Sequence, residues 1–212
     1  AWTQPVTDYT ADILRENGIT VEINQRVALD TSDWAPILDD VESSGAQVMI
    51  GALSHIPITG MVASWSRNEY PFTLEGIMIS AQSPQFLDDT GSEGMYLSTA
   101  TSACDGYADV TEHTSELMDL YQSEYDERPT TPTFVGFITY DTINLWAEAC
   151  ERAGTADHTE DIDAIVEELQ ATDYTGTYGR IQFYGPDAEY PNDVKTGEGP
   201  GDEFAPWNVT QW

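Results

Sequence analysis

Helical and strand-like patterns alternate along the first half of the chain, and this alternation limits the fold more than any other feature. Apolar residues recur at helical spacing in "TQPVTDYTADILRENG", "TSDWAPILDDVESSG" and "IPITGMVASWSRNEY". Strand-like stretches follow each of them, namely "ITVEINQRVAL", "QVMIGAL" and "TLEGIMI". Strands connected through helices by short loops form parallel sheets with right-handed crossovers. The sequence therefore predicts an α/β fold with a parallel sheet.

The pattern changes after residue 101. A strand-like "GMYLSTATS" is followed by three helical stretches, "TEHTSELMDLYQSEYDERP", "TFVGFITYDTINLWAEACERAG" and "TEDIDAIVEELQATD". The second, with Phe137, Ile143, Leu145 and Trp146, is too apolar for a surface helix, so we expect it to pack in a core. No strand-rich sequence accompanies these helices, so the sheet that they should cover is expected outside this chain. The remainder is punctuated by Gly and Pro, which indicates β structure and turns.

The charge of the chain excludes several partners. It has 38 acidic and 7 basic residues, a net charge of −31, and Lys195 as its only lysine. Nucleic acid and anionic membranes are excluded as partners because they are themselves anionic. So many negative charges destabilise a compact state unless salt screens them. This composition resembles that of proteins from extreme halophiles, and an acidic mesophilic protein is the alternative.

The beginning of the sequence and its two cysteines bear on a missing upstream part and on one possible disulfide. The sequence contains no membrane-spanning run and no signal peptide, and it begins at Ala1 without Met. We expect a fragment whose upstream part, including any export signal, is missing. Cys104 and Cys150 allow one disulfide, and two buried free thiols are equally compatible with the sequence.

An enzyme is disfavoured. Ser54 and His55 are neighbours, but no nucleophile elbow surrounds them, and no zinc motif or phosphate-binding glycine loop occurs in the sequence. Because the chain has 38 carboxylates, some pair will always lie at the separation found in glycosidases. Such a pair is therefore no specific sign of a glycosidase. The sequence therefore predicts no catalytic residues, no metal site and no cofactor.

Three stretches resemble one family when taken in order: "DTSDWAPILDDVESSGAQVMIG", "YQSEYDERPTTPTFVGFITYDTINLWAEACERAG" and "YTGTYGRIQFYGPD". The chain resembles the C-terminal part of the type I periplasmic-binding-protein fold, in the branched-chain amino acid (Leu/Ile/Val-binding protein-like) solute-binding family of ABC transporters. The resemblance implies two α/β lobes joined by three crossing strands, with ligand in the cleft between them. Residues 1–97 and 204–212 would form the second lobe. Residues 98–203 would supply helices and a hairpin of the first lobe, whose sheet is missing from this chain.

The resemblance also implies where this chain contacts its ligand. The corresponding positions are an aromatic at the start of the first helix, the loop after "QVMIGAL" and the end of "TLEGIMI": Trp2, Leu53, Ser54, His55, Met78 and Ser80. The alternatives are a lobe-packing role for Trp2, a helix-capping role for His55 and a core position for Met78. Amino-acid binders of the family place a carboxylate near the last position. Here the only acid in "TLEGIMISAQ" is Glu75, earlier in the strand, which argues against an α-amino acid ligand.

We expect an extracellular, cell-surface-anchored receptor that delivers a small polar molecule, an amino acid or a related compound, to the membrane permease of an ABC importer. A ligand-sensing regulator on the same fold is the alternative, and a hydrolase is the least favoured reading. The helices of residues 112–172 would expose the apolar face meant for the missing sheet, so self-association of this chain is also expected.

Overall fold

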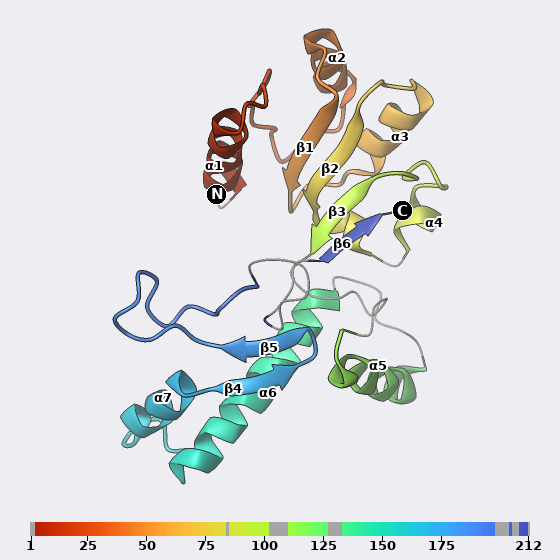
Figure 1. Ribbon diagram of the computed structural model, residues 1–212. Helices are drawn as coiled ribbons and strands as arrows, with labels where there is room; N and C mark the ends of the chain where they lie inside the picture. The colour runs from red at the N-terminus through yellow and green to blue at the C-terminus, as the bar shows by residue number, and fades with distance from the viewer. Residues whose placement is uncertain are drawn as a thin grey trace. The chain divides into compact units, whose positions relative to one another are not determined.

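Residues 3–83, 85–101, 110–126, 133–197, 204 and 208–211 are described by the computed structural model, shown in Figure 1. The chain divides into unit 1, residues 1–100 and 209–212, and unit 2, residues 101–208. None of the described helices combines the length and the apolar character needed to cross a membrane.

Unit 1 contains the predicted helix and strand alternation. Its elements in order are α1 (Thr3–Glu16), α2 (Ala35–Ser44), β1 (Val48–Leu53), α3 (Thr59–Arg67) and β2 (Thr73–Met78). β1 and β2 pair in parallel, with Val48 opposite Thr73 and Leu53 opposite Met78. The expected parallel sheet with an intervening helix is therefore confirmed.

Local sequence explains the bounds of α2. Pro36 lies in its first turn, where its missing N–H group costs no helical hydrogen bond. Gly45 ends the helix with a φ of 75° and donates its N–H to the carbonyl oxygen of Glu42 at 3.0 Å. This left-handed cap favours glycine, because a side chain would be strained there.

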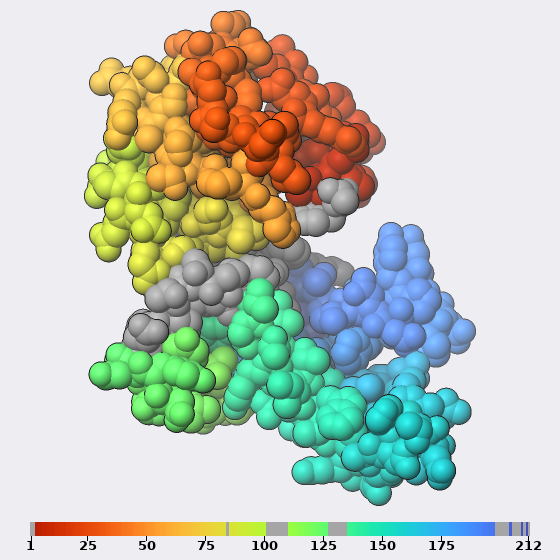
Figure 2. All heavy atoms as spheres, turned by 180° about the vertical axis from the view of Figure 1, so that it is seen from behind, coloured from red at the N-terminus to blue at the C-terminus, as the bar shows by residue number. Residues whose placement is uncertain are grey.

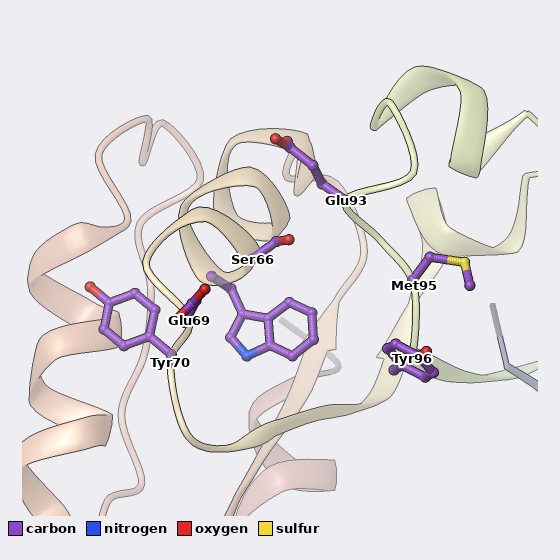
Figure 3. A pocket seen from close by; sticks show the side chains of 7 residues that line it. Ser66, Glu69, Tyr70, Glu93, Met95 and Tyr96 are labelled. Atoms are coloured by element: carbon purple, nitrogen blue, oxygen red, sulfur yellow. The ribbon is translucent and has the colours of Figure 1, made fainter.

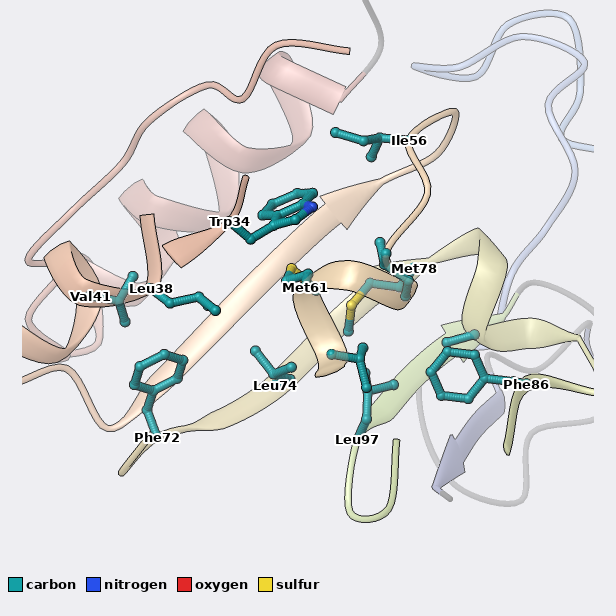
Figure 4. Packing of buried hydrophobic residues seen from close by; sticks show 13 residues of the cluster. Trp34, Leu38, Val41, Ile56, Met61, Phe72, Leu74, Met78, Phe86 and Leu97 are labelled. Atoms are coloured by element: carbon teal, nitrogen blue, oxygen red, sulfur yellow. The ribbon is translucent and has the colours of Figure 1, made fainter. Parts of the chain in front are cut away.

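The core of unit 1 lies between the sheet and the helices that cover it. Leu38 of α2, Met61 of α3 and Leu74 of β2 are almost fully buried, together with Trp34, and Figure 4 shows their side chains converging beside β1. Burial of such side chains contributes roughly 1.5–3 kcal/mol each. The apolar residues that recur at helical spacing in α2 and α3 therefore face the core of unit 1.

The predicted strand "ITVEINQRVAL" is wrong: residues 19–28 form no strand in the structure. Ile23 and Val27 still pack against the core, which explains why the apolar alternation resembled a strand. A strand also needs a neighbouring backbone for hydrogen bonding, and no described segment pairs with these residues. Apolar alternation alone could not distinguish a strand from an irregular segment that packs against the core.

Short elements complete unit 1. β2 is followed by the 3-10 helix η1 (Ile79–Gln82), then α4 (Phe86–Asp89), β3 (Ser98–Thr101) and, at the end of the chain, β6 (Asn208–Gln211). β3 and β6 pair with each other. The predicted strand "GMYLSTATS" is confirmed only in its second half. Residues 94–96 form a turn in which Tyr96 adopts a φ of 72°.

Unit 2 contains the three predicted helices and a hairpin: α5 (Glu112–Tyr125), α6 (Thr133–Ala153), α7 (Ile162–Gln170), β4 (Asp173–Gly176) and β5 (Gly179–Gln182). β4 and β5 pair antiparallel. The expectation for α6 is partly wrong, since Phe137 and Leu145 are buried but Ile143 is 61% and Trp146 43% exposed. α7 packs on α6, and Figure 2 shows atoms of both helices at the rear surface.

Candidate functional site

The carboxyl ends of β1 and β2 lie level with each other. We define the carboxyl edge as residues 53–60 and 78–83, which are the last residue of each strand and the segment after it. Leu53 is directly opposite Met78 in the parallel register, so the structure brings these two predicted site residues together. Ligands of open α/β sheets bind at such edges.

Polar side chains follow each strand at the carboxyl edge. The Ser54 hydroxyl and the Nδ1 atom of His55 are 2.6 Å apart. His55 and Ser80 are exposed, and Ser54 is half-buried. Ser80 can donate a hydroxyl hydrogen bond to a ligand. With a neutral imidazole, the Ser54–His55 pair can donate one more, through whichever of the two side chains is not already donating to the other.

Two of the alternative roles can be compared with the structure. The N-cap residue of α3 is Ile58, and no side chain caps this helix, so the structure shows no capping by His55. The Met78 side chain is only 1% exposed and belongs to the core cluster, as Figure 4 shows. Met78 therefore supports the carboxyl edge from within the core. Trp2 lies outside the described residues.

A polar contact that no sequence pattern predicted fixes the end of β2. Thr99 of β3 is fully buried, and its hydroxyl accepts the Met78 N–H at 3.0 Å and donates to the Met78 carbonyl oxygen at 3.3 Å. Gln82 donates its amide to the Ala100 carbonyl oxygen at 2.8 Å. Both contacts join β3 to the carboxyl edge within unit 1. Threonine is common in strands, so only the tertiary structure identifies this role.

A pocket of about 210 Å³ in unit 1 contains none of the predicted site residues. Figure 3 shows Tyr70 on one side of it and Met95 and Tyr96 on the other. The Tyr70 hydroxyl donates to an Asp39 carboxylate oxygen at 2.5 Å, and this bond raises the pKa of Tyr70 to about 12. Tyr70 therefore remains neutral at physiological pH.

A second pocket, of about 360 Å³, lies in unit 2 between α5, α6 and β4. His113 and Tyr174 line it, and the His113 Nδ1 atom is 2.8 Å from a Glu116 carboxylate oxygen. Burial is the main cause that raises the pKa of Tyr174 to about 12. Among the described residues, no group of three or more potential ligand side chains is placed to hold a metal ion.

A catalytic role for Ser54 and His55 has little support. A serine nucleophile needs a base that a third group orients. In the described part of the chain, the only hydrogen bond of the His55 side chain is to Ser54, its neighbour in sequence. Among the described residues, no third side chain orients the His55 ring.

The structure does not decide between a disulfide that joins Cys104 to Cys150 and two free thiols. Cys150 is buried in α6 and forms no disulfide with another described residue. Cys104 lies outside the described residues. Both alternatives therefore stay open.

Known proteins share both sequence and structural features with this chain. Residues 1–200 match the family described as "Periplasmic binding protein". No curated protein matches the sequence significantly.

Solved structures share the fold at low sequence identity. A protein from Silicibacter pomeroyi assigned to branched-chain amino acid ABC transport has a TM-score of 0.75 at 18% identity, over 97% of this chain and 51% of its own. A Leucine-, isoleucine-, valine-, threonine-, and alanine-binding protein from Brucella ovis has a TM-score of 0.69 at 13% identity, over 96% and 53%. An ABC transporter solute-binding protein from R. palustris in complex with benzoate has a TM-score of 0.64 at 12% identity, over 82% and 46%. The chain thus spans about half the length of these structures.

Proposed function

This chain belongs to the periplasmic binding protein family, and on that basis we propose that it is part of a solute-binding receptor of an ABC importer. The receptor binds a small polar molecule, an amino acid or a related compound, and involves no catalytic step. The similarity to structures of ABC transporter solute-binding proteins supports this proposal.

The observation that carries the proposal is the geometry of the carboxyl edge. β1 and β2 end at paired residues, Leu53 and Met78, and the polar side chains of Ser54, His55 and Ser80 follow at the same edge. An apolar floor with a few polar groups is typical of small-molecule sites. We propose that this edge, with Trp2, is one wall of the ligand cleft.

We further propose that this chain contributes to both lobes of the receptor. Residues 1–97 and 204–212 form the second lobe of the receptor, and residues 98–203 contribute to the first. The division of the chain near residues 100 and 208 supports this assignment. Closure of the two lobes around ligand would be a hinge motion, as in other two-lobed binding proteins.

The partners and location follow from the proposed role. The receptor acts outside the cell, anchored to its surface, and passes ligand to the permease subunits in the membrane. We also propose that the acidic surface is an adaptation to high salt, because 38 acidic residues would otherwise repel one another strongly.

Native mass spectrometry of the protein isolated from its own cells tests the proposed function. A solute-binding receptor with a closed cleft should retain a small molecule that dissociates on mild activation. A stoichiometric small-molecule adduct supports the proposal. A protein that carries none, and that gains none when incubated with an extract of small metabolites, contradicts it.

A further inference from the structure

The pocket of about 210 Å³ in unit 1 lies where β2 begins, at the opposite end of that strand from the carboxyl edge. The end of α3, the segment that leads into β2 and the turn before β3 form it. Its lining includes three aromatic rings, one thioether and two carboxylates, from Trp65, Tyr70, Tyr96, Met95, Glu69 and Glu93. The pocket is smaller than the roughly 300–1,000 Å³ of typical ligand sites, so it suits a small group.

Hydrogen bonds within the protein hold two of the three rings. The indole N–H of Trp65 donates to the carbonyl oxygen of Phe72 at 2.8 Å, and the Tyr70 hydroxyl donates to Asp39 at 2.5 Å. Both rings also pack against the core of unit 1. Their polar hydrogens are therefore not available to an anion, and these residues present aromatic surface to the pocket. Aromatic rings attract cations through their faces.

The charge of the pocket also favours a cation. The Arg67 Nε atom lies 2.5 Å from a Glu93 carboxylate oxygen, and this ion pair compensates the charge of Glu93. Glu69 is exposed, and in the described part of the chain it forms no ion pair. None of the residues that line the pocket is basic. An uncompensated carboxylate therefore lies beside aromatic rings, in a chain whose net charge of −31 attracts cations.

Two of the lining residues hold a backbone conformation that their side chains disfavour. Glu69 has a φ of 54° and Tyr96 a φ of 72°, both in the left-handed region. Glu69 follows the end of α3, where glycine is the usual residue in this conformation. Elsewhere in the described part of the chain, Asp126 and Asn192 are left-handed, but these residue types adopt that conformation more readily. Strained residues cluster at functional sites, and here both strained side chains meet at one pocket.

We propose that this pocket binds the methylated ammonium group of a small organic cation. A primary ammonium carries three N–H donors that need acceptors, whereas a methylated ammonium places methyl groups against aromatic rings and needs only a nearby negative charge. Glu69 supplies that charge, the three rings supply aromatic surface, and the Met95 thioether adds a polarisable apolar contact. This site is separate from the proposed solute site at the carboxyl edge and is additional to it.

Three matched probes test the ligand class. Choline carries a trimethylammonium group, 3,3-dimethylbutan-1-ol has the same shape without the charge, and ethanolamine has the charge without the methyl groups. Saturation-transfer NMR detects binding of each to the protein even at millimolar affinity. The titrations use the lowest KCl concentration at which circular dichroism shows folded protein, since salt screens charge effects.

We expect choline to bind about fivefold or more tightly than either of the other probes. Equal affinities for choline and the neutral alcohol would contradict the role of charge. Ethanolamine binding as tightly as choline would contradict the methylated class, and no binding of choline would overturn the site itself.

Glycine variants separate a binding role from a structural one. Tyr96→Gly removes the ring and also relieves the left-handed strain, so it should melt no lower than the native protein and still bind choline about threefold or more weakly. Glu69→Gln removes the charge alone and should weaken binding to a similar extent. Ser92→Gly relieves strain at a φ of 67° in the same turn without lining the pocket, and it should leave choline affinity unchanged. Native affinity in both Tyr96→Gly and Glu69→Gln would overturn the inference.

A variant at the carboxyl edge excludes binding there. His55→Ala should leave choline affinity unchanged, because His55 does not line this pocket. Loss of choline binding in His55→Ala, with native affinity in Tyr96→Gly, would place the cation at the carboxyl edge and contradict the inference. The retained-ligand measurement tests the proposed solute-binding function separately.

Discussion

Gly76 of β2 lies directly opposite Gly51 of β1, and a Cβ atom on Gly76 would collide with the carbonyl oxygen of Gly51. Gly76 also adopts a φ of 124°, a conformation that side chains rarely tolerate. The Gly76→Ala variant should therefore lose about 1–3 kcal/mol of unfolding free energy in urea titrations. Gly136→Ala is the control: Gly136 lies in α6 with open space around it, and alanine there should stabilise by about 0.5–1 kcal/mol. Equal stabilities of the two variants would refute this explanation.

The buried hydroxyl of Thr99 is expected to contribute to stability through Met78. Thr99→Val keeps the shape of the side chain but leaves the Met78 N–H without its 3.0 Å acceptor, which should cost about 1–3 kcal/mol. Thr99→Ser retains the hydroxyl and should recover most of this loss. Urea denaturation measures both, and a valine variant as stable as the native protein would show that the hydrogen bond contributes nothing.

Asp141 should give the protein a distinctive pH dependence. It is buried and accepts hydrogen bonds from the Thr177 N–H and hydroxyl, and burial raises its pKa above the usual 3.8. The protonated form is therefore favoured by folding, so its contribution to stability is full below 3.8 and is lost as pH rises through the folded-state pKa. The stability difference between Asp141→Asn and the native protein should shift in favour of Asn as pH rises.

Asp157 is the control for Asp141, because its pKa is shifted in the opposite direction. Hydrogen bonds from Thr159 lower the pKa of this exposed carboxyl, so its contribution is present above its unfolded pKa and is lost as pH falls. Asp157→Asn should therefore lose stability relative to the native protein as pH rises. Denaturation curves between about pH 3 and pH 7 at constant high salt compare the two variants. Parallel pH profiles would contradict the assignments.

Salt should stabilise the fold. A net charge of −31 produces self-repulsion that is screened over about 3 Å at 1 M salt and about 10 Å at 0.1 M. The melting temperature followed by circular dichroism should rise from 0.1 M to 3 M KCl. Equal melting temperatures would argue against adaptation to high salt.

Self-association is expected through α6. Val135, Ile143 and Trp146 are exposed apolar side chains spaced eight and three residues apart, which places them on one face of this helix. The double variant Ile143→Ser with Trp146→Ser should shift sedimentation velocity profiles in high salt towards monomer. Ile19→Ser with Leu29→Ser, two exposed apolar positions of unit 1, should not. A native chain that is monomeric at high concentration would contradict the expectation.

Much of unit 1 was predictable because its signals are local. Apolar spacing and Gly45 predicted α2, and the apolar run that ends at Leu53 predicted β1 and the edge where the candidate site lies. Ser54 and His55 could be singled out because they follow that run directly. The role of Thr99 could not be predicted, since it depends on a backbone 21 residues away.

By itself, the sequence indicated most of the helices, the strand–helix–strand order from which β1 and β2 were expected to be parallel, and the absence of acids from the carboxyl edge. These properties depend on residue spacing and type within short stretches. Only the tertiary structure decided that residues 19–28 form no strand, that Leu53 aligns with Met78, and that Ile143 is exposed. Strand pairing, register and burial each require a second segment of chain, and its position follows from packing rather than from local sequence.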